Sequence, residues 1–129
     1  MTCFWDGIIS SLDKDDLDVL GLTVIPKPAE LALRLKQLNK KTNQVYWEGQ
    51  PLRFNEIEEN YIHVRDFLHY NVINGYLCSI CDPFLCLLSQ LLKVNINHKY
   101  LNHTVHYTIN NSRKIFHFSS DRGHFWKQN

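Results

Sequence analysis

The sequence predicts an α+β domain, in which a helical N-terminal part is followed by an antiparallel sheet of about four strands. Apolar residues recur at helical spacing along most of the chain up to residue 93, whereas the apolar period becomes two from residue 94 onward. The length of 129 residues suits one domain, and no repeat, low-complexity tract or long linker divides the chain. We therefore expect a single domain over residues 1–129.

Three helices are predicted in the first half of the chain, at residues 4–12, 28–38 and 54–68, because apolar side chains recur there three and four positions apart. The acidic residues 13–18 predict a solvated turn with a short helix. Gly7 stands inside the first helix, where glycine costs about 1 kcal/mol relative to alanine. Its presence there indicates close packing of this helix against another element.

A further helix is predicted at residues 84–93. It is apolar on nearly every side, which is typical of a helix buried at the centre of a domain. Asp82 and Pro83 come before it in the order of an N-cap and a first-turn proline. Residues 44–47 are expected to form a short strand earlier in the chain.

The last third of the chain alternates apolar and polar residues between clusters of turn-forming residues. This pattern predicts strands at residues 94–98, 105–109, 115–118 and 123–126. Short turns separate the last three, so we expect these strands to pair in an antiparallel meander.

Composition limits the class of protein. The net charge of +1 gives no electrostatic attraction to nucleic acid or to a membrane surface, and no apolar run reaches the length of a membrane span. No secretory signal pattern is present, and the four cysteines are expected to be reduced thiols. We therefore expect a cytoplasmic monomer that binds neither nucleic acid nor membrane.

The candidate nucleophile is Cys3, and the candidate base is His124. Cysteine nucleophiles react as thiolates, which a helix N-terminus and a neighbouring imidazolium both favour. Cys3 stands where the first helix begins, and His124 stands on the last predicted strand after Gly123, which allows a close approach of the backbone. A functional cysteine so near the terminus also indicates a domain excised from a longer polyprotein. The plain alternative for Cys3 is a small buried hydrophobic residue.

The run Cys3-Phe4-Trp5-Asp6-Gly7-Ile8 resembles the nucleophile helix of the ovarian-tumour (OTU) deubiquitinases. Residues 83–96 are similar to the helix and strand that precede the sheet in that family, and residues 115–126 resemble its last two strands, which end in a histidine followed by an aromatic residue. The order of elements also resembles the wider papain-like clan, including viral leader proteases and the papain-like proteases of nidoviruses. The chain departs from the OTU pattern in having no Asp-Gly pair before the cysteine.

The resemblance implies a cysteine protease that cleaves after the C-terminal glycine of ubiquitin or a ubiquitin-like modifier. Such an enzyme would act in the host cytosol if the chain is viral, and it would use no cofactor and no metal. OTU enzymes often place Asn or Asp two residues after the histidine, a position that Trp126 occupies here. The third catalytic residue is therefore assigned first to Asn129, with Asp121 and Asp6 as alternatives, or the site is a dyad.

The resemblance also implies a narrow channel for the glycines of the modifier tail. Trp5 and Trp126 are candidates for its walls, and Gly123 is a candidate substrate-binding residue beside the histidine. Packing in the core is the alternative for both tryptophans.

Two other functions remain open. Cys78 and Cys81 have the spacing of a zinc knuckle, which Cys86 and either His98 or His103 would complete. The second alternative is a non-catalytic protein-interaction domain. Basic and aromatic residues are compatible with RNA binding, but the near-neutral charge argues against it.

Overall fold

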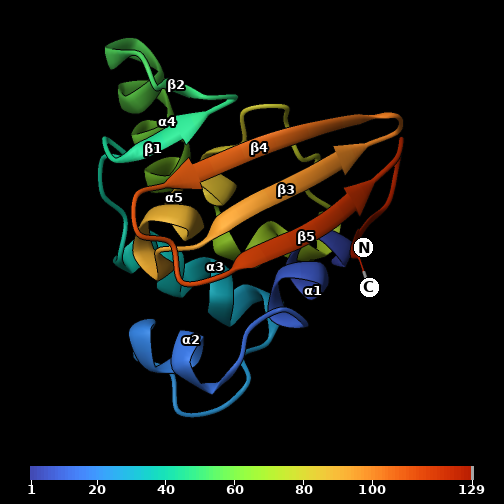
Figure 1. The fold of residues 1–129 in the computed structure, drawn as a ribbon. Coiled ribbons are helices and arrows are strands. Elements are labelled where there is room, and N and C mark those ends of the chain that lie inside the picture. The colour runs from blue at the N-terminus through green and yellow to red at the C-terminus, as the bar shows by residue number, and fades with distance from the viewer. Residues whose placement is uncertain (129) are drawn as a thin grey trace.

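The protein has an α+β fold, which a computed structural model describes over residues 1–128 (Figure 1). Its helices are α1 (Cys3–Ile9), α2 (Lys14–Val19), α3 (Pro28–Gln37), α4 (Phe54–Asp66), the 3-10 helix η1 (His69–Asn74) and α5 (Pro83–Leu92). Its strands are β1 (Val45–Trp47), β2 (Gln50–Pro51), β3 (Asn95–Tyr100), β4 (His103–Ile109), β5 (Ile115–Ser120) and β6 (Phe125–Lys127).

The predicted elements are present with their ends shifted by a few residues. The four predicted helices correspond to α1, α3, α4 and α5, the short helix in the acidic stretch is α2, and the early strand is β1. The four strands predicted in the last third of the chain are β3 to β6. The α+β class is therefore confirmed.

The predicted antiparallel meander is wrong, because the sheet is mixed and has the strand order β2-β1-β4-β3-β5-β6. β4 pairs antiparallel with one side of β3, whereas β5 runs parallel to β3 on its other side. After β4 the chain crosses to the far side of β3, where the N–H of Arg113 donates to the carbonyl of Lys93 at 2.8 Å. A period of two specifies a strand and its buried face, but it does not specify the neighbouring strand.

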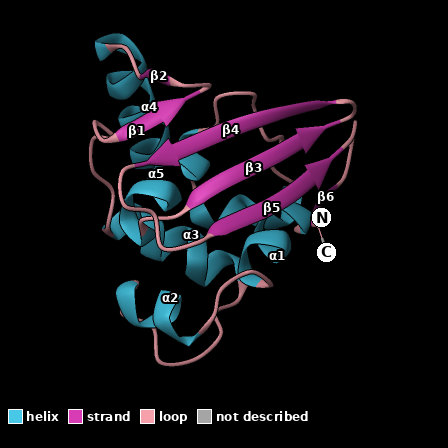
Figure 2. Cartoon of the chain, in the orientation of Figure 1, coloured by secondary structure: helices cyan, strands magenta, loops and turns pink. Residues whose placement is uncertain are grey.

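The helices lie against one face of the sheet, and the opposite face is open to the viewer in Figure 2. Side chains on β3 follow this division, because Ile96 and His98 are buried whereas Lys99 is exposed. One covered face and one solvated face account for the alternating pattern that predicted these strands.

α5 forms the centre of the core. Residues 83–90 are all buried, as the apolar run predicted. The Asp82 carboxylate accepts hydrogen bonds from the N–H groups of Phe84 at 2.9 Å and Leu85 at 3.2 Å, so the predicted N-cap is confirmed. Within residues 1–128, every helix falls short of the length and apolar character that crossing a bilayer requires.

The sequence predicts a solvated turn with a short helix at residues 13–18, but one side chain of this acidic stretch is buried. The Asp16 side chain is fully buried and pairs with Arg113 at 2.8 Å and Lys114 at 2.6 Å, both from the connection between β4 and β5. Lys114 also pairs with the exposed Asp13, and the pKa of Asp13 falls to about 2 through this contact. These ion pairs fix α2 to the start of β5.

The two ends of the chain meet where α1 packs on β6. Gly7 supplies the close approach that its position in the helix predicted: a Cβ built on it would lie 2.8 Å from Cδ1 of Phe125. Any larger side chain would therefore have to displace the buried ring of Phe125 in β6. This contact sets the distance between Cys3 and the residues that precede β6.

Candidate active site

Cys3 is the first residue of α1, and its side chain is half-buried. Thr2 precedes the helix as its N-cap residue, and its hydroxyl donates to the Asp6 carboxylate at 2.7 Å. The terminal amine of Met1 donates to the carbonyl of Ile73 in η1, which anchors the chain just before the cysteine. These contacts fix the start of α1, where Cys3 stands.

His124 lies at the end of a tight turn between β5 and β6. The Asp121 carboxylate accepts from the N–H groups of Gly123 at 3.2 Å and His124 at 3.1 Å. The N–H of Asp121 in turn donates to the carbonyl of His124 at 3.0 Å. These bonds hold the backbone of the turn and leave the His124 side chain exposed.

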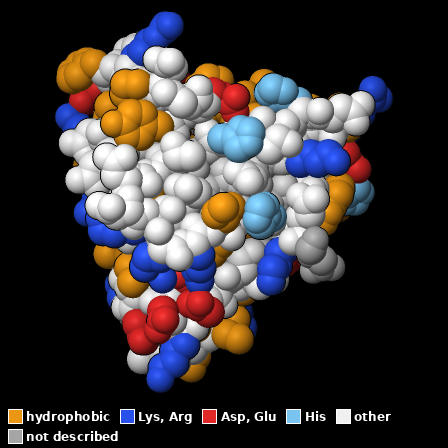
Figure 3. Space-filling view, in the orientation of Figure 1, with side chains coloured by type: hydrophobic (Ala, Val, Ile, Leu, Met, Phe, Trp, Pro, Cys, Tyr) orange, Lys and Arg blue, Asp and Glu red, His pale blue; other side chains and the backbone are white. Residues whose placement is uncertain are grey.

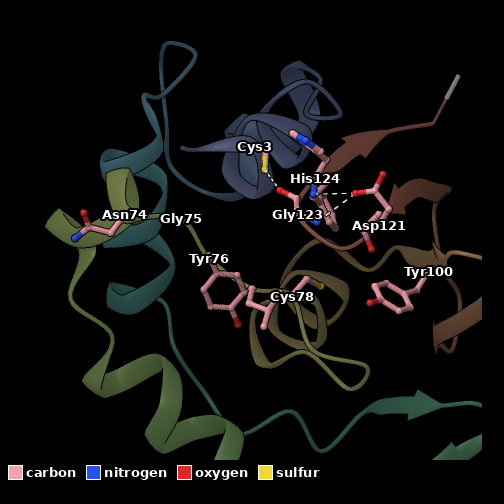
Figure 4. A pocket seen from close by; sticks show the side chains of 12 residues that line it. Cys3, Asn74, Gly75, Tyr76, Cys78, Tyr100, Asp121, Gly123 and His124 are labelled. Atoms are coloured by element: carbon pink, nitrogen blue, oxygen red, sulfur yellow. Dashed lines mark hydrogen bonds between the residues drawn. The ribbon is translucent and has the colours of Figure 1, made fainter.

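Cys3 and His124 line the same pocket, which has a volume of about 320 Å³ (Figure 4). The Cys3 thiol donates to the carbonyl of Gly123 at 3.9 Å, across a separation of 120 residues in the sequence. Its hydrogen bond therefore reaches the residue next to His124 and not the imidazole ring itself. The candidate nucleophile and base thus line one pocket, although they stand near opposite ends of the sequence.

The candidates for a third catalytic residue have other partners or lie outside the described residues. Asn129, the first candidate, lies outside the described residues. Asp121 and Asp6, the alternatives, accept their hydrogen bonds from the backbone of the turn and from Thr2. Of the candidate catalytic residues, Cys3, His124 and Asp121 line the pocket.

The two candidate wall tryptophans lie in different environments. Trp5 is 0% exposed and packs edge-on against Phe4 and Phe84, so in this structure it belongs to the core and not to the wall of a channel. Trp126 is 44% exposed, and it lines a shallow depression between α1 and β6 together with Cys3. Of the two, only Trp126 is placed to contact a ligand near Cys3.

Beside the pocket lies a Cys–His–Ser cluster that sequence reasoning did not assemble, and its Cys78 and Ser120 line the pocket whereas His98 lies behind them. Nδ1 of His98 lies 3.9 Å from Sγ of Cys78, and its Nε2 lies 2.6 Å from Oγ of Ser120. His98 is almost completely buried, and burial lowers its pKa to about 4. The alternation of β3 predicted a buried face at this position, but the partners of His98 come from two other segments.

The components of the alternative zinc site are dispersed. Cys78 lies beside His98, whereas Cys81 lies beside Cys86. A hydrogen bond from the Cys86 thiol lowers the pKa of Cys81. His103 is exposed at the start of β4. No group of three or more His, Cys, Asp or Glu side chains within residues 1–128 is arranged to hold a metal ion.

Over the part of the chain that the structure describes, the histidines on the open face of the sheet are spread out. His106 and His117 are exposed there, and Figure 3 shows the histidine side chains of this face spaced apart, with acidic and basic groups at its margins. His106 lies 3.6 Å from the carboxylate of Glu48.

Comparisons of the chain with protein-family models, curated proteins and solved structures found no match. An assignment of function therefore depends on the geometry of the site and on the resemblance of short motifs.

Proposed function

We propose that this protein is an OTU-type, papain-like cysteine protease that cleaves after the C-terminal glycine of ubiquitin or a ubiquitin-like modifier. The observation that carries the proposal is the meeting of Cys3 and His124 in one pocket. The order of the parts is also the one that the resemblance implies: the nucleophile stands at the first helix, the helices precede the sheet, and the base stands at the turn before the last strand.

The proposed reaction is acyl transfer through a thioester. His124 takes the proton from Sγ of Cys3, and the thiolate attacks the carbonyl carbon of the terminal glycine. The C–N bond breaks as His124 returns the proton to the leaving amine. Water, activated by the same imidazole, then hydrolyses the thioester and restores the thiol.

The start of α1 supports stabilisation of the oxyanion. The first helical hydrogen bond runs from the N–H of Asp6 to the carbonyl of Thr2, so the N–H of Cys3 precedes the hydrogen-bonded ladder. An N–H at this position can donate to the oxygen of the tetrahedral intermediate, a contact worth roughly 3 kcal/mol in related sites.

The exposed His124 ring must approach Sγ during the reaction. Catalytic hydrogen bonds are often long in unliganded enzymes and shorten when substrate is bound. We expect the ring to move onto Sγ when a substrate tail fills the pocket, which displaces the thiol from the carbonyl of Gly123.

Exposed apolar side chains beside the pocket support a protein substrate. Leu77 is 83% exposed at the pocket rim, and Ile73, in the adjacent η1, is 67% exposed. Apolar groups exposed together near a reactive pocket favour contact with another protein.

Hydrolysis of a fluorogenic amide at the C-terminus of ubiquitin tests the proposal. We expect turnover by the wild type, loss of turnover in Cys3→Ala, and a strong decrease in His124→Ala. Cys81→Ala and His117→Ala are matched controls, because both residues lie outside the pocket, and both should retain wild-type rates. Turnover that survives Cys3→Ala would overturn the assignment, and tight ubiquitin binding without turnover would favour the interaction domain.

A further inference from the structure

The wall of the pocket opposite Cys3 is a segment without helix or strand, Gly75–Cys81, which we call the wall segment. Four of its residues line the pocket: Gly75, Tyr76, Leu77 and Cys78. Figure 4 shows Tyr76 and Cys78 on the side of the pocket away from Cys3 and His124. An irregular segment keeps one shape only if side chains hold it, so its anchors determine the width of the pocket.

The principal anchor is Asp82, whose two carboxylate oxygens serve different elements. Oδ1 accepts the N–H groups that cap α5. Oδ2 accepts a hydrogen bond from the hydroxyl of Tyr76 at 2.8 Å. It also accepts two from Ser79, one from its N–H at 3.1 Å and one from its hydroxyl at 3.3 Å. One oxygen therefore starts the central helix, and the other gathers the wall segment around it.

Further contacts fix both ends of the wall segment. The hydroxyl of Tyr107 accepts from the N–H of Asp82 at 2.9 Å and donates to the carbonyl of Ile80 at 2.8 Å. The Tyr76 ring packs on the ring of Phe4, with 4.4 Å between the two centroids. Phe4 is the residue directly after Cys3 in α1. The segment is thereby tied both to the sheet and to the helix that carries the candidate nucleophile.

An aspartate is a costly choice for this position if capping is its only task. Asp82 is fully buried, and burial raises its pKa despite the hydrogen bonds that it accepts. Serine is an equally good N-cap residue and carries no charge that must be desolvated. The oxygen that serine lacks is the one that holds Tyr76 and Ser79.

We propose that Asp82 is a positioning residue, which holds the wall segment at the distance from Cys3 that a glycine-rich polypeptide tail requires. This inference rests on the proposed function and names the group that determines access to the site. Asp82 does not touch the reacting atoms. It acts through Tyr76, Ser79 and the backbone between them.

Asp82→Ser and Tyr76→Phe test the proposal, because each removes the tether in a different way. Asp82→Ser retains a helix cap, and Tyr76→Phe retains the ring that packs on Phe4. We expect each to lower kcat/KM for the fluorogenic ubiquitin amide about tenfold, mainly through KM, since one lost hydrogen bond to a charged group is worth about 1.4 kcal/mol or more. Tyr70→Phe is the matched control, because Tyr70 is exposed and lies outside the pocket.

Two readouts separate positioning from a general loss of structure. Alkylation of Cys3 by iodoacetamide should proceed within twofold of the wild-type rate in both variants (about 0.4 kcal/mol at most), because the small reagent needs no channel. Backbone amides of residues 75–81 should exchange with solvent about tenfold faster, whereas those of α5 should not.

Unchanged kcat/KM together with unchanged amide exchange in both variants would overturn the role of Asp82. A fall in kcat with no change in KM would also contradict it. If the wild type itself fails to hydrolyse the ubiquitin amide, the proposed function fails. In that case the rate of amide exchange in the wall segment, compared between the wild type and the two variants, still decides whether Asp82 holds the segment in place.

Discussion

Gly7→Ala places a methyl group where α1 contacts β6, and its effect can be estimated from the structure. The new Cβ would lie 2.8 Å and 3.0 Å from Cδ1 and Cε1 of Phe125, and 3.5 Å from Cα of Trp126. Carbon atoms in contact normally lie about 3.5–4.0 Å apart, so the Phe125 ring must retreat by roughly 0.5–1 Å. The ring is buried and packs on Phe4 and Phe118, so we expect part of this shift to pass to the backbone of β6. His124 immediately precedes β6, so we expect it to move with the strand.

The expected cost in stability is small, and the expected cost in activity is larger. Overpacking destabilises by about 1–3 kcal/mol, while alanine in a helix gains about 1 kcal/mol over glycine. The net loss of about 1 kcal/mol should lower Tm by about 4 °C. Misplacement of a catalytic group by about 1 Å costs on the order of a hundredfold in rate, so we expect kcat/KM to fall between about ten- and a hundredfold.

The assay pairs thermal unfolding with hydrolysis of the ubiquitin amide. Phe125→Leu, added to Gly7→Ala, removes the ring atoms that the new methyl group would strike, and it should restore part of the lost activity. Phe125→Leu alone is the control for the loss of the ring. Wild-type activity and Tm in Gly7→Ala would refute the idea that this contact sets the distance between the proposed catalytic groups, Cys3 and His124.

Three further predictions concern stability and the surface. Asp16→Ala should lower the free energy of unfolding in urea by about 2–3 kcal/mol, because it removes the charged hydrogen bonds of Arg113 and Lys114 to a buried carboxylate and leaves Lys114 paired only with the exposed Asp13. Asp15→Ala should change it by less than about 0.5 kcal/mol, and equal effects would contradict the ion-pair account. Because burial lowers the pKa of His98 from 6.5 to about 4, the folded chain binds this proton more weakly than the unfolded chain. Stability should therefore fall as pH drops from about 6.5 to 4, by about 3 kcal/mol in total, and Tm of His98→Gln should depend less on pH over this window; an unaltered slope would count against a neutral buried His98. Trp126→Ala should reduce turnover of the ubiquitin amide with little change in Tm, whereas Trp5→Ala should cost about 3–5 kcal/mol of stability; the reverse pattern would exchange their assigned roles.

Local patterns in the sequence predicted the local features of the fold. Helical spacing located the helices, Asp82 and Pro83 marked the start of α5, and Gly7 indicated a close contact. Each of these depends on neighbours within a few residues or on a steric requirement of one residue. The partner of Gly7 was not predictable in the same way, because Phe125 lies at the other end of the chain.

Features that depend on distant partners were missed. The sequence alone predicts a solvated Asp16, because the two cations that pair with it, Arg113 and Lys114, lie 97 and 98 residues further along the chain. The parallel pairing of β3 and β5 escaped prediction because alternation does not encode strand order. His98 was considered only as a metal ligand, although its partners are Cys78 and Ser120.

The most direct test is the mass of the protein after incubation with ubiquitin that carries an electrophile at its C-terminus. The account predicts one covalent adduct, mapped to Cys3, which is absent in Cys3→Ala and forms much more slowly in His124→Ala. An adduct on Cys78 or Cys81, or no adduct in the wild-type protein, would contradict the claim that Cys3 and His124 form a reactive pair.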